Sequence, residues 1–87
     1  MRIIKTARFQ RAYDKLTDED LLAVDRALRL FLENPRHPGL HFEKLKGSRY
    51  RTIRVTRGRL RIVLRGDGAE MDLVDIGNHD YVDGKYG

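Results

Sequence analysis

The spacing of apolar residues changes along this chain, from a helical period in its first half to a period of two in its second half. Before the first helical stretch, residues 2–6 carry the β-branched Ile3 and Ile4 and predict a short opening strand. From residue 7 the helical spacing predicts a first helix. Its apolar face is formed by Phe9, Ala12, Tyr13 and Leu16.

A second helix is predicted to follow almost at once. Thr17 or Asp18 supplies a capping oxygen, and acidic residues in the first turn suit the positive end of the helix dipole. Asn34 before Pro35 predicts its end, because proline disfavours helical geometry in the preceding residue. The two helices are expected to form a hairpin. The apolar stripe of the second helix consists of Leu21, Val24, Leu28, Phe31 and Leu32.

The remainder of the chain predicts a loop and then three strands. Residues 35–48 hold both prolines and show little periodicity, whereas residues 50–56 and 59–65 alternate around a tight turn at Arg57-Gly58. Residues 71–76 are apolar apart from Asp72 and Asp75, which is typical of an interior strand. Residues 78–87 are polar without a clear period, so no element is predicted there.

These elements predict an α+β fold in the order β-α-α-β-β-β, with an antiparallel sheet packed on a helical hairpin. The other face of the sheet is expected to be partly open. A chain of 87 residues holds a single core, so residues 1–87 are expected to be one domain.

Composition and charge narrow the classes of function. The formal charge is +5, and residues 44–65 contain many basic residues and no acid, a pattern typical of a surface that binds a polyanion. The absence of cysteine excludes disulfides and thiolate metal sites, and the three histidines lack zinc-type spacing. We expect no metal, no cofactor and no membrane association, and a cytoplasmic location.

The exposed face of the predicted hairpin is the main candidate for a site. Alternation places Arg54 and Arg61 together on it, with Arg59 and Arg65 along the same strand. Guanidinium groups bind phosphate oxygens in a bidentate manner, so RNA is the favoured ligand. The alternative is an ordinary solvated face in a basic protein. His79, just beyond the last strand, is expected near the same face and can transfer a proton near neutral pH, or else is a solvated loop residue.

Several motifs in this order resemble the RelE/ParE superfamily of bacterial type II toxins. They are Asn34-Pro35, Leu45-Lys46-Gly47, Tyr50–Val55, Leu60–Leu64 and Val74–Asp80. The resemblance covers most of the chain and implies the toxin of a toxin–antitoxin system. One branch cleaves mRNA on the ribosome, and another inhibits DNA gyrase without acting as an enzyme.

For the RNA-cleaving branch, which we favour, the resemblance implies attack of a ribose 2′-hydroxyl on the adjacent phosphate to leave a cyclic phosphate. Arg61 would hold the scissile phosphate, and Arg54 would bind the phosphate or the backbone. His79 would act as general acid, and Tyr81 or Tyr86 would stack on a base or supply a proton. Further RNA contacts are expected from Lys46, Arg51, Arg59 and Arg65.

The general base is unassigned in this scheme. Position 52 is threonine, where the best-known RNA-cleaving branch has lysine, and arginine stays protonated. His79, His41 and Asp80 are the candidates. The expected partners are a cognate antitoxin, the ribosome and mRNA. The alternatives are a gyrase-inhibiting toxin and a basic binding domain without toxicity.

Overall fold

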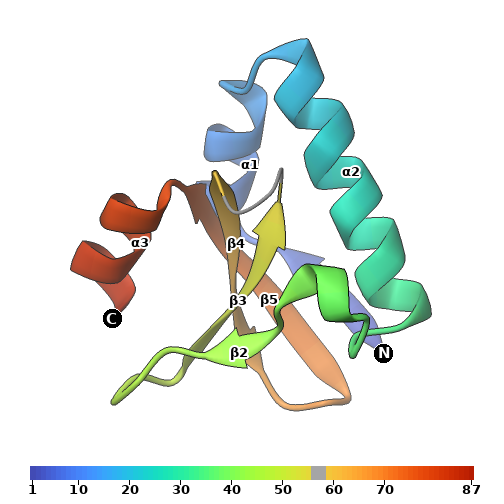
Figure 1. The fold of residues 1–87 in the computed structure, drawn as a ribbon, viewed down its shortest axis with the longest axis vertical. Helices are drawn as coiled ribbons and strands as arrows, with labels where there is room; N and C mark the ends of the chain where they lie inside the picture. The colour runs from blue at the N-terminus through green and yellow to red at the C-terminus, as the bar shows by residue number, and fades with distance from the viewer. Residues whose placement is uncertain (56–58) are drawn as a thin grey trace.

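The computed structural model describes residues 1–55 and 59–87, so the predicted turn at Arg57-Gly58 lies outside the described residues. Figure 1 shows the order of the elements along the chain. They are β1 (Arg2–Lys5), α1 (Ala7–Asp14), α2 (Asp18–Glu33), the 3-10 helix η1 (Pro38–Leu40), β2 (Glu43–Lys44), β3 (Tyr50–Val55), β4 (Leu60–Gly66), β5 (Glu70–Gly77) and α3 (His79–Tyr86).

The strands form one five-stranded sheet in the order β1-β5-β4-β3-β2. The predicted α+β class and the helical hairpin are confirmed, since α1 and α2 cover one face of this sheet (Figure 1). The expectation of a fully antiparallel sheet is corrected by β1, which pairs with β5 in parallel. A parallel pair needs a long crossover, and here the helical hairpin and the β2–β4 meander together provide it.

Side-chain caps define where the helices begin. The Thr6 hydroxyl accepts a hydrogen bond from the Phe9 amide at the start of α1, and Thr17 does the same for Asp20 at the start of α2. Helix α2 ends at Glu33, and Asn34 caps it directly before Pro35, where the sequence predicts the end.

The main core lies between the helical hairpin and the sheet. The side chains that fill it have almost no exposed surface, and each strand from β3 to β5 contributes alternate residues. Its fully buried members are Phe9, Val24, Phe31, Leu40, Ile53, Ile62, Leu64 and Leu73.

A second, smaller core lies on the opposite face of the sheet. Residues 78–87, where no element was predicted, contain the helix α3, which is capped by the Asn78 side chain. Its buried residues Val82 and Tyr86 pack against Val63 and Val74 of the sheet. The face predicted to be partly open is therefore partly covered by α3, whose Val82 and Tyr86 lie one helical turn apart on the same side of the helix.

The predicted loop at residues 35–48 also contains short elements, η1 and the two-residue strand β2. Leu40 of η1 is buried in the main core, which fixes this segment beside β3. Of the helices in residues 1–55 and 59–87, none is long and apolar enough to span a membrane.

Candidate functional site

The two arginines predicted to share a face lie directly opposite each other. Arg54 of β3 pairs in register with Arg61 of β4, and Arg61 pairs in turn with Gly77 of β5. We call Arg54, Arg61 and Gly77 the transverse row. Neighbouring strands lie about 4.8 Å apart, so the two arginine backbones are adjacent. Because Ile53 on β3 faces the helical hairpin, the row faces the other way, toward the side that α3 occupies.

Both arginines have hydrogen-bonding capacity that residues 1–55 and 59–87 do not use. The Nε atoms of Arg54 and Arg61 are buried and find no acceptor among the described residues. Arg61 keeps 14% of its side chain exposed, and its Nη1 lies 3.8 Å from the Glu43 carboxylate, a long contact for an ion pair. Buried donors without partners carry a free-energy cost, which an anion with several acceptor oxygens would offset. The row is therefore suited to bind a phosphate group.

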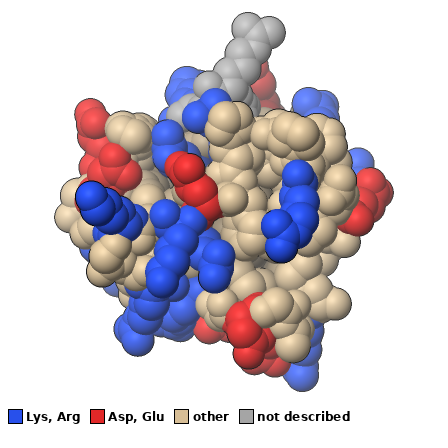
Figure 2. Space-filling view, turned by 60° about the horizontal axis from the view of Figure 1, so that its bottom comes forward, with Lys and Arg blue, Asp and Glu red and all other residues tan. Residues whose placement is uncertain are grey.

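Charge is unevenly distributed over the surface of the molecule. Figure 2 shows one face on which Lys and Arg side chains gather near the middle of the view, beside an acidic side chain. Such clustering raises the local concentration of anionic ligands more effectively than the same charge spread evenly.

His79 begins helix α3, two residues after Gly77 of the transverse row. Its side chain is more than half exposed, and Nε2 lies 2.8 Å from the Asp83 carboxylate one helical turn later. Since Gly77 is the register partner of Arg61, the chain brings this imidazole to the end of the sheet that carries the arginines. Asp80, one residue later, is exposed at the same helix end.

The two candidate tyrosines share one buried carboxylate. Tyr81 and Tyr86 donate hydrogen bonds to Asp75 Oδ2 at 2.7 and 2.6 Å, and Asp75 is 2% exposed. Burial and the Asp75 hydrogen bond raise the pKa of Tyr86 well above its ordinary value, and the same hydrogen bond raises the pKa of Tyr81. Neither hydroxyl is thus primed to release its proton near neutral pH.

The tyrosine rings differ in position. Tyr86 is buried against Tyr50, with ring centroids 4.8 Å apart, so its ring is covered by protein. Tyr81 is 42% exposed, and its ring lies over Gly77 at the end of the transverse row. Of the two, Tyr81 is therefore placed for stacking on a base. Sequence reasoning overlooked Asp75, although an acid inside an otherwise apolar strand was a usable signal.

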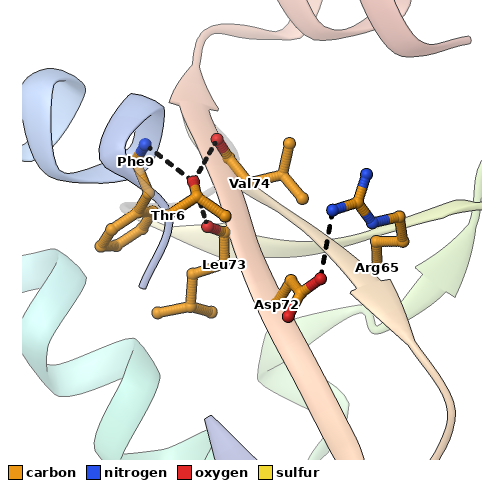
Figure 3. A network of polar contacts seen from close by, with 6 residues as sticks. All are labelled: Thr6, Phe9, Arg65, Asp72, Leu73 and Val74. Carbon is orange, nitrogen blue, oxygen red and sulfur yellow. Dashed lines mark hydrogen bonds and ion pairs between the residues drawn. The ribbon is translucent and has the colours of Figure 1, made fainter. Parts of the chain in front are cut away.

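The four residues expected to make further RNA contacts are not brought together. Arg65 lies on the same face as the transverse row, at the far end of β4, and pairs with Asp72 at 3.1 Å (Figure 3). This hydrogen bond raises the pKa of Arg65. Lys46 is exposed in the turn between β2 and β3.

Arg51 and Arg59 point away from the row. Arg51 lies two residues from Ile53 in β3, so its side chain points to the face of the sheet that the helical hairpin covers. Its guanidinium lies 5.7 Å from the centroid of the Phe42 ring. Arg59 precedes β4 and forms an ion pair with Asp20 of α2. The expectation that Arg59 flanks Arg61 is corrected, because a carboxylate distant in sequence holds it beside α2.

His41, the remaining candidate base, is exposed and adopts a left-handed backbone conformation with φ 45° at the end of η1. It precedes β2, the edge strand on the β3 side of the sheet. Among the described residues, no group of three or more histidines, cysteines or acids is arranged to hold a metal ion.

No protein-family model matches this chain, and no curated protein matches it. Solved structures do match it. YafQ from E. coli strain BL21(DE3) is 15% identical, covering 94% of this chain and 98% of that one, with a TM-score of 0.76. The RelB-RelE antitoxin–toxin complex from Methanococcus jannaschii gives 15% identity, 91% and 93% coverage and a TM-score of 0.71. The intact E. coli RelBE toxin–antitoxin complex is 19% identical, covering 88% of this chain and 94% of that one, with a TM-score of 0.68.

These likenesses, all at low identity, concern the fold. The chain has the α+β fold of the RelE and YafQ proteins, and the resemblance drawn from its sequence motifs is confirmed at that level.

Proposed function

We propose that this protein is a toxin that cleaves mRNA on the ribosome, with Arg61, Arg54 and His79 as the residues that act on the RNA. The observation that carries the proposal is the transverse row, in which two adjacent arginines have buried Nε donors without acceptors among the described residues, and an exposed histidine lies two residues beyond Gly77. The RelE-like fold adds support, since the solved structures that share it include proteins described as toxins.

The chemistry fits these groups. The 2′-hydroxyl oxygen attacks the adjacent phosphorus, the bond from phosphorus to the 5′ oxygen breaks, and a 2′,3′-cyclic phosphate and a 5′-hydroxyl remain. Arg61 and Arg54 stabilise the negative charge that develops on the non-bridging oxygens. His79 donates a proton to the leaving 5′ oxygen. Asp80 and His41 are the candidates to accept the proton of the 2′-hydroxyl.

The proposed function includes partners. A cognate antitoxin would neutralise the toxin, as the RelB proteins found in complexes with RelE suggest. The ribosome would present the mRNA, which places the protein in the cytoplasm, and residues 1–87 would act as one toxin domain.

Primer extension on mRNA from cells that express the protein tests this function, with and without ongoing translation. We expect cuts that require translation. Arg61→Ala and His79→Ala should each reduce cleavage by roughly a hundredfold or more, as losses of charge stabilisation and proton transfer do. Arg26→Ala is a matched control on the exposed surface of α2 and should cleave normally.

The other functions give different results in the same cells. Intact mRNA together with inhibited DNA supercoiling would indicate a gyrase-inhibiting toxin. Intact mRNA without growth arrest would indicate a basic binding domain. Full cleavage by both the Arg61→Ala and the His79→Ala variant would refute the assigned residues.

A further inference from the structure

Helix α1 carries a basic face outside the site described above. Arg8, Arg11 and Lys15 follow one another at helical spacing and are all exposed. In the part of the chain that the structure describes, none of the three forms an ion pair with an acid. The Asp75 hydrogen bond raises the pKa of the neighbouring Tyr81, and Arg8 acts to lower it. The exposed charges of all three basic side chains remain accessible to an anionic ligand.

This basic face borders two hollows that run between α1 and α3. One, of about 420 Å³, is lined by Arg8, Arg65 and Lys85 together with Tyr50 and Tyr86. The other, of about 350 Å³, has walls formed by the α1 face and by Tyr81. Arg8 lines both, so the two hollows adjoin at this side chain. We call them together the α1–α3 groove.

The arrangement of the sheet creates this groove. β1 pairs with residues 70–73 of β5, so among the described strands none lies beside the second half of β5 on that edge. The Thr6 hydroxyl donates to the backbone carbonyl of Leu73 and also caps α1, which fixes the helix beside that free edge (Figure 3). α3 then covers the sheet from the other side.

One end of the groove reaches the transverse row. Tyr81 lines the groove, and its ring also lies over Gly77, the register partner of Arg61. The ring is partly exposed, and Lys85 Nζ lies 5.9 Å from its centroid. An exposed aromatic ring among cations is the combination that binds single-stranded nucleic acid, because bases stack on the ring while cations contact phosphates.

We propose that the α1–α3 groove binds single-stranded RNA, with Arg8, Arg11 and Lys15 contacting consecutive phosphates and Tyr81 stacking on a base next to the transverse row. This inference rests on the proposed function, because it extends the path of the RNA away from the scissile phosphate. The RNA comes either from the mRNA or from an unpaired segment of ribosomal RNA, since both present the same backbone.

Binding of a fluorescent 12-nucleotide RNA with 2′-O-methyl groups, which cannot be cleaved, tests the groove separately from the chemistry. The triple variant Arg8→Ala/Arg11→Ala/Lys15→Ala should bind about tenfold or more weakly at 0.1 M salt. The slope of log affinity against log salt concentration should fall by about 2, as expected for three lost phosphate contacts. Arg26→Ala/Arg29→Ala on α2 is the matched control and should bind as the unaltered protein does.

A second arm uses 70S ribosomes without mRNA, with binding followed by co-sedimentation. Weaker binding of the triple variant to the 12-nucleotide RNA supports the groove with mRNA as the source. A loss confined to the ribosomes supports it with ribosomal RNA as the source. Unchanged affinity in both arms, with thermal melting showing an intact fold, overturns the inference. Comparing cleavage with binding separates the two proposals. If the proposed function alone is wrong, the unaltered protein does not cleave mRNA, but the triple variant still loses RNA affinity.

Discussion

The ring of Tyr81 occupies the space that a side chain on Gly77 would need. A Cβ at residue 77 would overlap the ring, so the glycine is required for α3 to approach the end of β5. This contact links the last strand to the helix that begins with His79, and it sits at the end of the transverse row.

Gly77→Ala should therefore destabilise the protein and move Tyr81. Overpacking of this kind costs about 1–3 kcal/mol, which urea denaturation would measure. Gly84→Ala is the matched control in α3, because nothing lies within 4 Å of the position of its Cβ. Alanine at this helical position should leave stability unchanged or raise it by up to about 1 kcal/mol. Equal stabilities for the two variants would contradict the packing described here.

The Asp75 carboxylate should control how the tyrosines titrate. Its hydrogen bonds contribute to pKa values above the ordinary 10.0 for Tyr81 and Tyr86, so the native state holds these protons more tightly than the unfolded chain. The resulting stabilisation is complete below pH 10.0 and is lost as the pH rises through the native pKa values. In tyrosinate absorbance, Asp75→Asn should shift ionisation to lower pH.

A matched control for the titration is Asp25→Asn. Asp25 accepts the Tyr13 hydroxyl at 2.7 Å and raises the pKa of Tyr13 alone. Its removal should lower the pKa of Tyr13 and leave the pKa values of Tyr81 and Tyr86 unchanged. An Asp75→Asn titration curve that superimposes on that of the unaltered protein would show that the shared carboxylate has no such role.

Arg54→Gln should separate stability from activity. Like charges directly opposite on neighbouring strands are destabilising by about 0.2–1 kcal/mol, so removing one arginine of the register pair should raise the free energy of unfolding slightly at low salt. Cleavage of mRNA should fall at the same time. Thermal melting at low and high ionic strength measures the first effect, which salt should diminish. A clear loss of stability would mean that Arg54 is structural.

Thr6→Val should cost more than the corresponding change at Thr17. Thr6 caps α1 and also donates to the Leu73 carbonyl at 2.8 Å. The Thr17 side chain caps α2 and makes no second hydrogen bond to the described residues. Loss of a cap costs about 1 kcal/mol, and loss of a second hydrogen bond adds a similar amount. Urea denaturation of Thr6→Val and Thr17→Val should reveal this difference. Equal losses would show that the contact with β5 contributes nothing.

The spacing of apolar residues was sufficient to predict the elements whose partners are close in sequence. The helical stripes of α1 and α2 and the alternation in β3 and β4 are local signals, and they predict the face that carries Arg54 and Arg61. α3 escaped prediction because only Val82 and Tyr86 of its residues are buried. A usable signal was present in Asn78, a capping residue followed by an acid in the first turn.

Contacts between distant residues lay beyond sequence reasoning. Pairing of β1 with β5 depends on the whole fold, and so does the ion pair that draws Arg59 to Asp20. The shared role of Asp75 depends on α3 lying over the sheet. The arginine pair could thus be predicted, whereas its surroundings required the structure.

The parallel pairing of β1 with β5 has a consequence for synthesis on the ribosome. Arg2 and Glu70 are register partners, so the first strand has no place in the sheet until the last strand has left the exit tunnel. Pairings across such long sequence separations form late and slowly. A nascent chain would therefore keep the arginines of β3 and β4 on an unfinished sheet, and the transverse row, which includes Gly77 of β5, would be completed only after the last strand has emerged.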